Sequence, residues 1–438
     1  MKGMINMFVS DALNVNSQGN LTIGGMDTVA LAKEYGTPLY VMDEDLIRDN
    51  LRRFHGSIDR FYGGKGMVCY AGKAFTCLEM CRVVASEGDG LDAVSIGELY
   101  TAVKAGFPME RVGFHGNNKT DEELAYALDN GVGHIIVDNI SELHRLEKIA
   151  AEKGIKAQIM FRIKPGIDAH THKAVMTGQI DSKFGFALET GEAFEAVKEA
   201  LSCENTDLVG VHCHIGSQIF DIEPFEEAAR VMLRFIAKIK AELGYEVKSL
   251  DLGGGFGIKY LEEHDPAPFE NYLERVSAVV KAECGSLGIS QPFIIIEPGR
   301  SVVAPAGITL YTVGARKEIP GIRTYISVDG GMTDNPRYIL YQSEYEAVVA
   351  NKASQKRSEK VTIAGKCCES GDLIGEGMPL QHAESGDILA VLATGAYNYS
   401  MSSNYNRVPK PAVVFVSGGK SRVVVKRETP EDIIRNDI

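Results

Sequence analysis

The sequence lacks the features that would place the chain in or across a membrane. No apolar run approaches the roughly 20 residues that a helix needs to span a bilayer. The first residues, MKGMINMFVSDALNVN, lack the basic start and the long apolar stretch of a secretory signal. Both absences lead us to expect a cytoplasmic protein.

The sequence also lacks any block of basic residues. Its 438 residues carry 46 basic and 59 acidic side chains, which gives a net charge of −13 at pH 7. Such a chain is a poor ligand for nucleic acid or for an anionic membrane, because both attract clustered lysines and arginines. We therefore expect a small molecule as the partner, with local arginines deciding whether it is anionic.

Paired cysteine motifs are missing as well. The eight cysteines form no paired CxxC motifs, and Cys213, between His212 and His214, has no distant partner pair of the kind that a zinc site needs. Free thiols are the expected state in a long cytosolic chain. No metal site is predicted, and the glycines do not form the GxGxxG pattern of a dinucleotide site.

From about residue 66 to 300, short apolar runs alternate with helix-like stretches. Apolar and polar residues do not alternate along these runs, as is expected of strands that are buried on both faces of a parallel sheet. They lie at residues 67–71, 91–94, 112–114, 134–137, 157–163, 208–211, 249–252 and 293–296. Between them, Ser95 with Glu98 and Thr120 with Glu123 match the capping box of a helix start. Eight alternations predict a (β/α)8 barrel, with an open doubly wound sheet as the alternative.

The pattern changes after Arg300. Short strand-like runs are now separated by Gly, Pro, Asn and Asp, and few long helical patterns remain. The runs lie at residues 308–313, 324–328, 361–363, 388–392, 412–416 and 423–425. We therefore predict a barrel domain over residues 45–300 and a mainly β domain made of residues 1–44 and 301–438.

Polar clusters follow the predicted barrel strands, at the carboxyl ends where barrel enzymes build their active sites. Lys73 at the barrel mouth could be partly desolvated, which would suit its amine to a Schiff base, although a lone lysine is more often solvated. The amides of Gly253–Gly255 can approach a phosphate, where the alternative is a flexible turn. Glu297 could keep a pyridine nitrogen protonated or be a salt-bridge residue. His214 could lie against such a ring or be a hydrogen-bonded core histidine.

Together these clusters resemble the fold-type III pyridoxal-phosphate (PLP) decarboxylases, whose barrel is of the alanine-racemase type, and within them the diaminopimelate decarboxylases. The resemblance runs from about Pro38 to Asn406. Its motifs are YAGKA at 70–74, FHGNNK at 114–119, DSKFG at 181–185, HIGSQ at 214–218, GGGFG at 253–257, EPGR at 297–300, CESGD at 368–372 and GAYNYSMSSNYN at 395–406.

The resemblance implies roles toward the cofactor PLP. Lys73 would carry it as a Schiff base, His214 would stack on its ring, and Glu297 would pair with the pyridine nitrogen. The residues that would hold its phosphate end are Ser217, Gly255, Gly299 and Tyr397, with Arg300 beside them. The sequence departs from the family at Phe75, where Asn is usual, and at Asn398, where Gly or Cys is commoner, and neither departure removes an assigned group.

The resemblance also implies a substrate. The residues that would contact it are Arg300, Arg337, Tyr341, Glu369 and Tyr397. The activity would be decarboxylation of meso-diaminopimelate to L-lysine and carbon dioxide, the last step of lysine biosynthesis. The arginines offer planar forks for the distal carboxylate, and Glu369 offers an anion for the distal ammonium. The i,i+4 spacing of Arg337 and Tyr341 would place both on one face of a helix.

A shared site in a homodimer is implied too, with Cys368 standing near the reaction centre from the partner subunit. Either Cys368 or Lys73 could return a proton to the substrate carbon. A decarboxylase of ornithine, arginine or lysine is the first alternative, but it would need no arginine pair. A PLP-binding protein without activity would not need Lys73, Glu297 and Cys368 together. A racemase would want a second base, such as tyrosine.

Overall fold

The structure is a computed structural model that describes residues 8–167 and 182–438. The start of the DSKFG motif, Asp181, lies outside the described residues, as do the first seven residues. By its internal contacts the chain divides into a barrel unit, residues 50–257 and 266–299, and a second unit, residues 1–49, 258–265 and 300–438. The predicted domain bounds, 45–300 and 1–44 with 301–438, stay a prediction.

The barrel unit contains the predicted (β/α)8 barrel. Its nine-stranded sheet closes on itself, since β13 pairs with β5 and β8 pairs with β9, all in parallel. The two-residue β10 (Phe186–Ala187) pairs with β9 outside this ring. The ring strands are β5 (Gly66–Ala71), β6 (Gly90–Ala93), β7 (Val112–Phe114), β8 (His134–Val137), β9 (Ala157–Lys164), β11 (Thr206–His212), β12 (Ser249–Asp251) and β13 (Phe293–Ile296).

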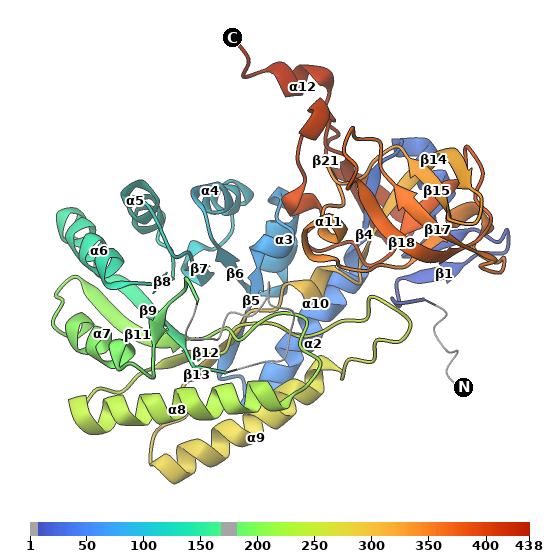
Figure 1. Cartoon of the computed structure of the whole chain (residues 1–438). Helices are drawn as coiled ribbons and strands as arrows, with labels where there is room; N and C mark the ends of the chain where they lie inside the picture. Colours follow the sequence, from blue (N-terminus) through green and yellow to red (C-terminus); the bar gives the residue numbers. More distant parts are fainter. Residues whose placement is uncertain (1–7, 168–181) are drawn as a thin grey trace. The chain divides into compact units, whose positions relative to one another are not determined.

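Helices connect successive strands and lie outside the ring (Figure 1). They are α2 (Glu44–Tyr62), α3 (Leu78–Glu87), α4 (Ile96–Ala105), α5 (Asp121–Asp129), α6 (Ile140–Lys153), α7 (Glu192–Ala200), α8 (Glu223–Leu243) and α9 (Phe269–Leu287). The capping box predicted at Thr120 and Glu123 is present. The one predicted at Ser95 is half formed, because the Glu98 carboxylate accepts from the amide of Val94 instead of Ser95.

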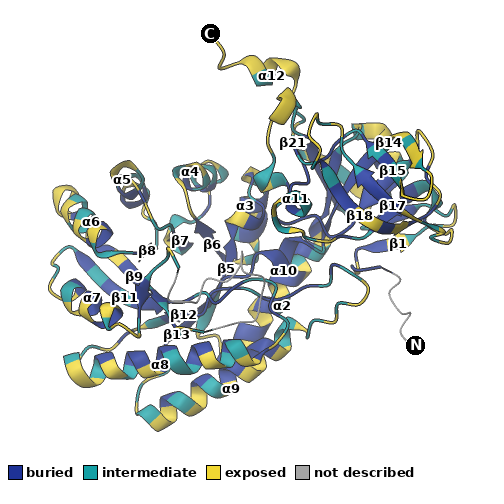
Figure 2. Cartoon of the chain, viewed as in Figure 1, coloured by how far each residue is buried: buried dark blue, intermediate teal, exposed yellow. Residues whose placement is uncertain are grey.

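The strands of the barrel are buried on both faces, as their continuous apolar runs predict. Figure 2 shows the ring in the colour of buried residues, while helices such as α8 and α9 carry exposed residues on their outer faces. Cys69, Ile136, Met160 and Ile295 pack together from four different strands inside the ring. No helix among the described residues is long and apolar enough to cross a membrane.

The second unit is built on a mixed β-sheet. Strand β4 (Leu39–Asp43), from the start of the chain, lies between β14 (Gly307–Ile319), to which it is antiparallel, and β20 (Ala412–Ser417), to which it is parallel. The remaining strands of this sheet are β15 (Arg323–Val328), β16 (Ala347–Val349), β17 (Glu359–Ala364), β18 (Leu373–Leu380), β19 (Ile388–Val391) and β21 (Lys420–Val425). The runs predicted after Arg300 are strands, while β16 and β18 were not predicted.

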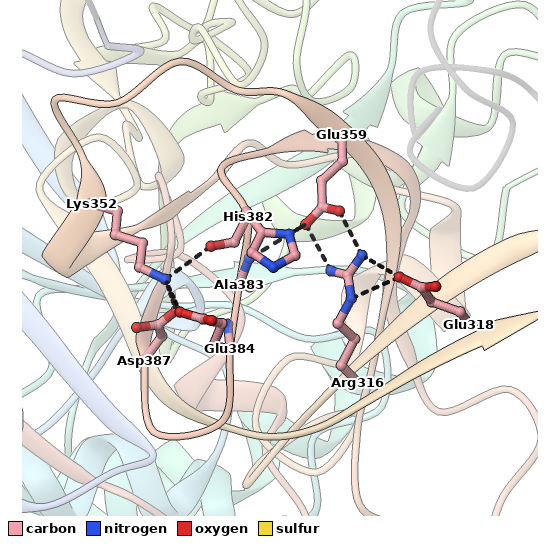
Figure 3. A network of polar contacts seen from close by, with 8 residues as sticks. All are labelled: Arg316, Glu318, Lys352, Glu359, His382, Ala383, Glu384 and Asp387. Atoms are coloured by element: carbon pink, nitrogen blue, oxygen red, sulfur yellow. Dashed lines mark hydrogen bonds and ion pairs between the residues drawn. The ribbon is translucent and has the colours of Figure 1, made fainter.

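Shorter elements complete the second unit. They are β1 (Leu13–Val15), β2 (Leu21–Ile23), β3 (Met26–Asp27), α1 (Thr28–Tyr35), α10 (Arg300–Val303), α11 (Arg337–Tyr341) and α12 (Pro430–Ile434). A polar network also crosses this unit (Figure 3). Arg316 forms two hydrogen bonds with Glu359, at 2.8 and 2.9 Å, and Lys352 pairs with Asp387 at 2.7 Å. These pairs hold together segments that are far apart in the sequence.

Candidate active site

Lys73 lies in a tight turn, Gly72–Ala74, that follows β5 at the carboxyl end of the barrel. The turn is fixed to the neighbouring strand, because the amide of Ala71 donates to the Pro298 carbonyl at 3.1 Å. A side chain at Gly299 would meet Ala71 and Ala74, so only glycine allows this close approach. The Lys73 side chain itself is exposed in the single chain, and the expected partial desolvation of its amine stays a prediction. Its amine is therefore open to a carbonyl ligand.

The glycine loop after β12 is tightly packed. The Gly255 carbonyl accepts from the amide of Ile219 at 3.0 Å, and the amide of Gly257 donates to the Ile219 carbonyl at the same distance. A Cβ on Gly255 would lie 2.6 Å from the Gly216 carbonyl oxygen, and Gly255 has a φ of +115°. These contacts favour a held loop over the alternative of a flexible turn. The loop is a rigid backbone surface joined to the segment that carries His214 and Ser217.

Glu297 follows β13, is 8% exposed, and lies against two imidazoles. The Nε2 atom of His212 lies 3.3 Å from its Oε2 atom, at hydrogen-bond geometry. The Nε2 atom of His115 lies 2.9 Å from its Oε1 atom. The two imidazole rings meet edge to face, with centroids 5.1 Å apart. One oxygen of Glu297 is thus hydrogen-bonded to His212 on β11, and the other lies close to His115, which follows β7.

Two further carboxyls are buried in the same end of the barrel, Asp92 on β6 and Asp251 on β12. Burial, together with the charge of Glu297, raises the pKa of both aspartates well above the usual range. Burial would also raise the pKa of Glu297, but His115 and His212 hold it well below its usual range. Glu297 is therefore the ionised member of this group.

Lys119, the last residue of the FHGNNK motif, fixes the loop from which His115 projects. Its ammonium is 1% exposed and donates to the carbonyl oxygens of Gly116 at 2.8 Å and Ile136 at 2.7 Å. It also pairs with the buried carboxylate of Glu142 at 2.7 Å. A buried charge with these partners is costly to displace, so the end of β7 is held against β8 and α6.

In the second unit, two buried arginines lie against one tyrosine. The guanidinium carbon of Arg300 is 4.9 Å from the ring centroid of Tyr397, and that of Arg337 is 5.1 Å from the same centroid. Arg337 also lies 5.2 Å from the ring of Tyr341, one turn further along α11, as the i,i+4 spacing predicts. Tyr397 has a φ of +65°, a left-handed conformation that costs energy in a residue with a side chain. The structure brings these four predicted residues together.

The sequence analysis missed Tyr260, which supports this arrangement. Its hydroxyl accepts a hydrogen bond from Nη1 of Arg300 at 2.8 Å, and its ring packs edge to face on that of Tyr345. Tyr345 in turn accepts from the side-chain amide of Asn398, the residue at which the sequence departs from the family. A buried hydroxyl facing a guanidinium fixes its orientation. A lone tyrosine after the glycine loop gave no signal of this contact.

Cys368 and Glu369 lie on an exposed loop of the second unit. The loop is shaped by buried Asp372, whose carboxylate accepts from the amides of Cys367 at 2.7 Å and Met332 at 2.6 Å. The amide of Cys368 donates to the side-chain oxygen of Asn406 at 2.8 Å. Neither Cys368 nor Glu369 forms a side-chain hydrogen bond or ion pair with Arg300 or Arg337 within the described part of this chain.

Comparison with known proteins identifies the family. The family described as pyridoxal-dependent decarboxylase, pyridoxal binding domain, matches residues 45–304. The chain is 51% identical to the diaminopimelate decarboxylase of Bacillus methanolicus, over 96% of this chain and 98% of that one. It is 49% identical to that of Bacillus subtilis strain 168, over 99% and 98% of the two chains. The chain belongs to the diaminopimelate decarboxylase family.

Solved structures agree with this membership. The diaminopimelate decarboxylase of M. jannaschii in complex with L-lysine has a TM-score of 0.92 and 37% identity, over 99% of each chain. That of Helicobacter pylori, also complexed with L-lysine, has a TM-score of 0.85 and 34% identity, over 93% of this chain and 98% of that one. A lysine/ornithine decarboxylase of Vibrio vulnificus is 21% identical with a TM-score of 0.75, which shows a common fold alone.

Diaminopimelate decarboxylases of this family depend on PLP, and the barrel residues fit that cofactor. The ionised, buried carboxylate of Glu297 suits a protonated ring nitrogen, and the open amine of Lys73 comes from the adjacent strand. Within the described residues, 8–167 and 182–438, the amides of Gly255 and Gly299 donate no hydrogen bond. Both amides are therefore available for a phosphate. Burial and the charge of Lys73 hold the pKa of His214 well below its usual range, which leaves a neutral, flat ring.

No prediction assigned roles to His115, His212, Asp92 or Asp251. The signal was present in part, because an aspartate inside the apolar runs 91–94 and 249–252 is unusual for a buried strand. The ligand atoms of His115, His212 and Glu297 lie within 4.8 Å of one another, so they also form a group that could hold a metal ion. The absence of a metal stays a prediction.

Proposed function

We propose that this chain catalyses PLP-dependent decarboxylation of meso-diaminopimelate to L-lysine and carbon dioxide in the cytoplasm. The observation that carries the substrate assignment is the pair of buried guanidiniums of Arg300 and Arg337 around the ring of Tyr397. Two fixed positive charges among phenol rings suit a second carboxylate on the substrate. A substrate with only a distal cation would be repelled by them.

Lys73 would hold the cofactor through its amine, in exchange with the substrate amine. Glu297 would pair with the ring nitrogen and keep it protonated, and His214 would stack on the ring. Ser217, Gly255 and Gly299 would hold the phosphate, and Tyr397 and Arg300 are the other residues proposed to bind the cofactor. When bound, PLP accepts the electron pair of the broken bond between Cα and the carboxylate.

After carbon dioxide leaves, a proton must return to Cα. The thiol of Cys368 and the amine of Lys73 are the two groups proposed for this step. Tyr341 and Tyr397 flank the arginines that orient the far end of the substrate, and Glu369 takes the distal ammonium. Tyr260 supports Arg300 by accepting its hydrogen bond, so it is a positioning residue for the substrate.

The deciding experiment compares kcat/KM of the purified protein for meso-diaminopimelate, ornithine and lysine. Turnover of meso-diaminopimelate far above that of the other two supports the proposal. Faster turnover of ornithine would instead identify a basic amino-acid decarboxylase. PLP binding without turnover of any of them would identify a non-catalytic PLP-binding protein.

We also propose that the enzyme is a homodimer with shared active sites. The exposure of Cys368 and Glu369, and the absence of a side-chain hydrogen bond or ion pair between them and the arginines within the described part of one chain, support a partner subunit as the place where they act. Mixing inactive Lys73→Ala with inactive Cys368→Ala should restore part of the activity through hybrid dimers. Failure to restore activity, with subunit exchange demonstrated by mass spectrometry, would show that each site is built from one chain.

A further inference from the structure

The carboxyl end of the barrel contains three buried carboxyls on different strands, Asp92, Asp251 and Glu297. Three carboxylates cannot all be ionised in such a place, because each added negative charge is poorly solvated and repels the others. A protonated pyridine nitrogen is best supported when the single negative charge lies on the carboxyl that faces it. Neighbouring groups must therefore stabilise the ionised form of one carboxyl over the other two.

The two histidines lie closest to Glu297 and favour its ionised form. Oε2 of Glu297 is hydrogen-bonded to Nε2 of His212 at 3.3 Å, and Oε1 lies 2.9 Å from Nε2 of His115, a close approach without hydrogen-bond geometry. Asp92 has only a longer approach, 3.7 Å, to His115, and neither of its oxygens has a hydrogen-bond partner among the described residues. Asp251 uses one oxygen to accept from the amide of Gly253 at 2.8 Å, and its other oxygen has no partner in the described part of the chain.

We infer that His115 and His212 are positioning residues that place the negative charge on Glu297, alone among the three buried carboxyls, and so keep the cofactor ring nitrogen protonated. The inference rests on the proposed pairing of Glu297 with that nitrogen. Both imidazoles are neutral near pH 7, because burial lowers the pKa of both and that of His212 falls to about 4; His212 is placed to donate to Glu297, and His115 lies against its other oxygen. A neutral N–H group stabilises a carboxylate without cancelling its charge.

The surrounding groups are consistent with this role. Arg162 on β9 contributes a positive charge that acts on Glu297 and Asp251, and Lys73 contributes one that acts on Asp92. His134 on β8 is neutral, because burial lowers its pKa to about 4. Lys119 and Glu142 fix the loop of His115, which makes its approach to Glu297 a built contact.

The test measures the ring nitrogen directly. Wild type and variants are reconstituted with PLP labelled with 15N in the ring, and the nitrogen chemical shift is recorded near neutral pH. The wild-type shift should be that of a protonated nitrogen. In His212→Leu and His115→Leu the shift should move toward the unprotonated value, because the charge is no longer held on Glu297. In both variants kcat should fall while KM changes little, since substrate contacts are untouched.

Two controls separate this role from a structural one. His134→Leu removes an imidazole that is buried in the same barrel but forms no ion pair with Glu297 in the described part of the chain, unlike His115 and His212, so the nitrogen should remain protonated. His212→Gln keeps an N–H group at the position of Nε2 and should restore the protonated shift. The inference would be overturned if the His212→Leu variant folds, binds the cofactor and still gives the wild-type chemical shift of the ring nitrogen. If His212→Leu does not fold, an unprotonated nitrogen in loaded His212→Gln would overturn it.

Failure of the proposed function gives a different result. Glu297→Gln should itself lose the protonated shift, and an unchanged shift would remove the pairing on which the inference rests. The wild type could instead have a protonated ring nitrogen whose shift depends on the histidines, yet not turn over meso-diaminopimelate. That result would support the inference and reject the proposed substrate.

Discussion

The barrel unit and the second unit bury different kinds of ionisable side chain. The barrel gathers the carboxyls of Asp92, Asp251 and Glu297 around two imidazoles. The second unit instead packs the guanidiniums of Arg300 and Arg337 among phenol rings. Carboxyls and imidazoles can gain or lose a proton on burial, whereas a guanidinium stays charged.

The charge of the barrel carboxyls is therefore conditional and set by neighbours, while the charge of Arg300 and Arg337 in the second unit is permanent. Burial would lower the pKa of Arg300, yet the phenols of Tyr260 and Tyr397 raise it. A conditional charge suits a group that must hold a proton on a cofactor. A permanent positive charge suits recognition of a substrate carboxylate by a chain whose net charge is −13.

The largest expected effect comes from the barrel. Lys73→Ala should lower kcat by at least about 10²–10⁴-fold, the size of a general acid–base contribution, because the amine that holds the cofactor is lost. Borohydride reduction of the wild type followed by peptide mapping should place the cofactor on Lys73. Lys104→Ala, at another exposed lysine of the barrel unit, should keep full activity. A label on a lysine other than Lys73 would refute the assignment.

Breaking the permanent charge of the second unit should change selectivity. Arg337→Ala should cost roughly 2–5 kcal/mol for meso-diaminopimelate, since its distal carboxylate loses a buried charged partner. That is on the order of 30-fold or more in kcat/KM. Residual lysine turnover should fall far less, because lysine has no distal carboxylate.

The matched control for Arg337 is Arg323→Ala. Arg323 is more exposed and pairs with Glu376 at 2.6 Å in the same unit, so neither substrate should be affected. The measurement is kcat/KM for both substrates on both variants and the wild type. Equal losses for the two substrates in Arg337→Ala would mean that the arginine supports the fold or the cofactor.

The sequence predicted the barrel because its strands are continuous apolar runs. All eight runs overlap ring strands, and those at 112–114, 134–137 and 293–296 match them residue for residue. Strand β18 was missed because Leu373–Leu380 contains two glycines, a glutamate and a proline, which are typical of turns. Strand β16 is only three residues long. Local pattern thus predicts strands that are uniformly buried better than those near an edge.

The candidate site was predicted less completely. The physical reason is that its residues lie far apart in the sequence and meet only in the folded barrel. Motifs such as EPGR carried Glu297 through the resemblance to a family. The contacts of Glu297 with His115 and His212, however, join residues about 180 and 85 positions apart and exist only when the ring closes. The desolvation expected for Lys73 depends in the same way on what surrounds the turn, which no local pattern contains. Pairing between strands is not encoded in any single window of sequence.

A conditional charge also occurs in the second unit, at Asp334, three residues before Arg337. Burial raises its pKa to about 7, although Tyr311, Gly331 and Thr333 donate to its carboxylate. An unfolded aspartate titrates near 3.9, so the folded state binds the extra proton between about pH 4 and 7. The stability that Asp334 contributes is present below about pH 4 and is lost as pH rises through about 7.

Asp334→Asn should therefore flatten the dependence of stability on pH. Because asparagine cannot ionise, the free energy of unfolding of the variant should fall less steeply with pH over that range. The difference in slope from wild type should be up to about 1.4 kcal/mol per pH unit. Urea unfolding at several pH values from about 5 to 8 measures the difference in slope. Parallel curves for wild type and variant would mean that Asp334 is ionised throughout.

The smallest effect is expected where charges are only partly buried. Arg316 is 21% exposed and forms two hydrogen bonds with Glu359, while its other partner, Glu318, is 64% exposed (Figure 3). Exposed pairs contribute about 0.2–1 kcal/mol, because water solvates the separated charges almost as well. Arg316→Gln should therefore lower the free energy of unfolding by about 1 kcal/mol or less, and kcat should not change. Urea unfolding in low and high salt should show the loss shrinking as salt screens the pairs. A loss of several kcal/mol that salt leaves unchanged would show that this network is an electrostatically buried core, like the carboxyls of the barrel.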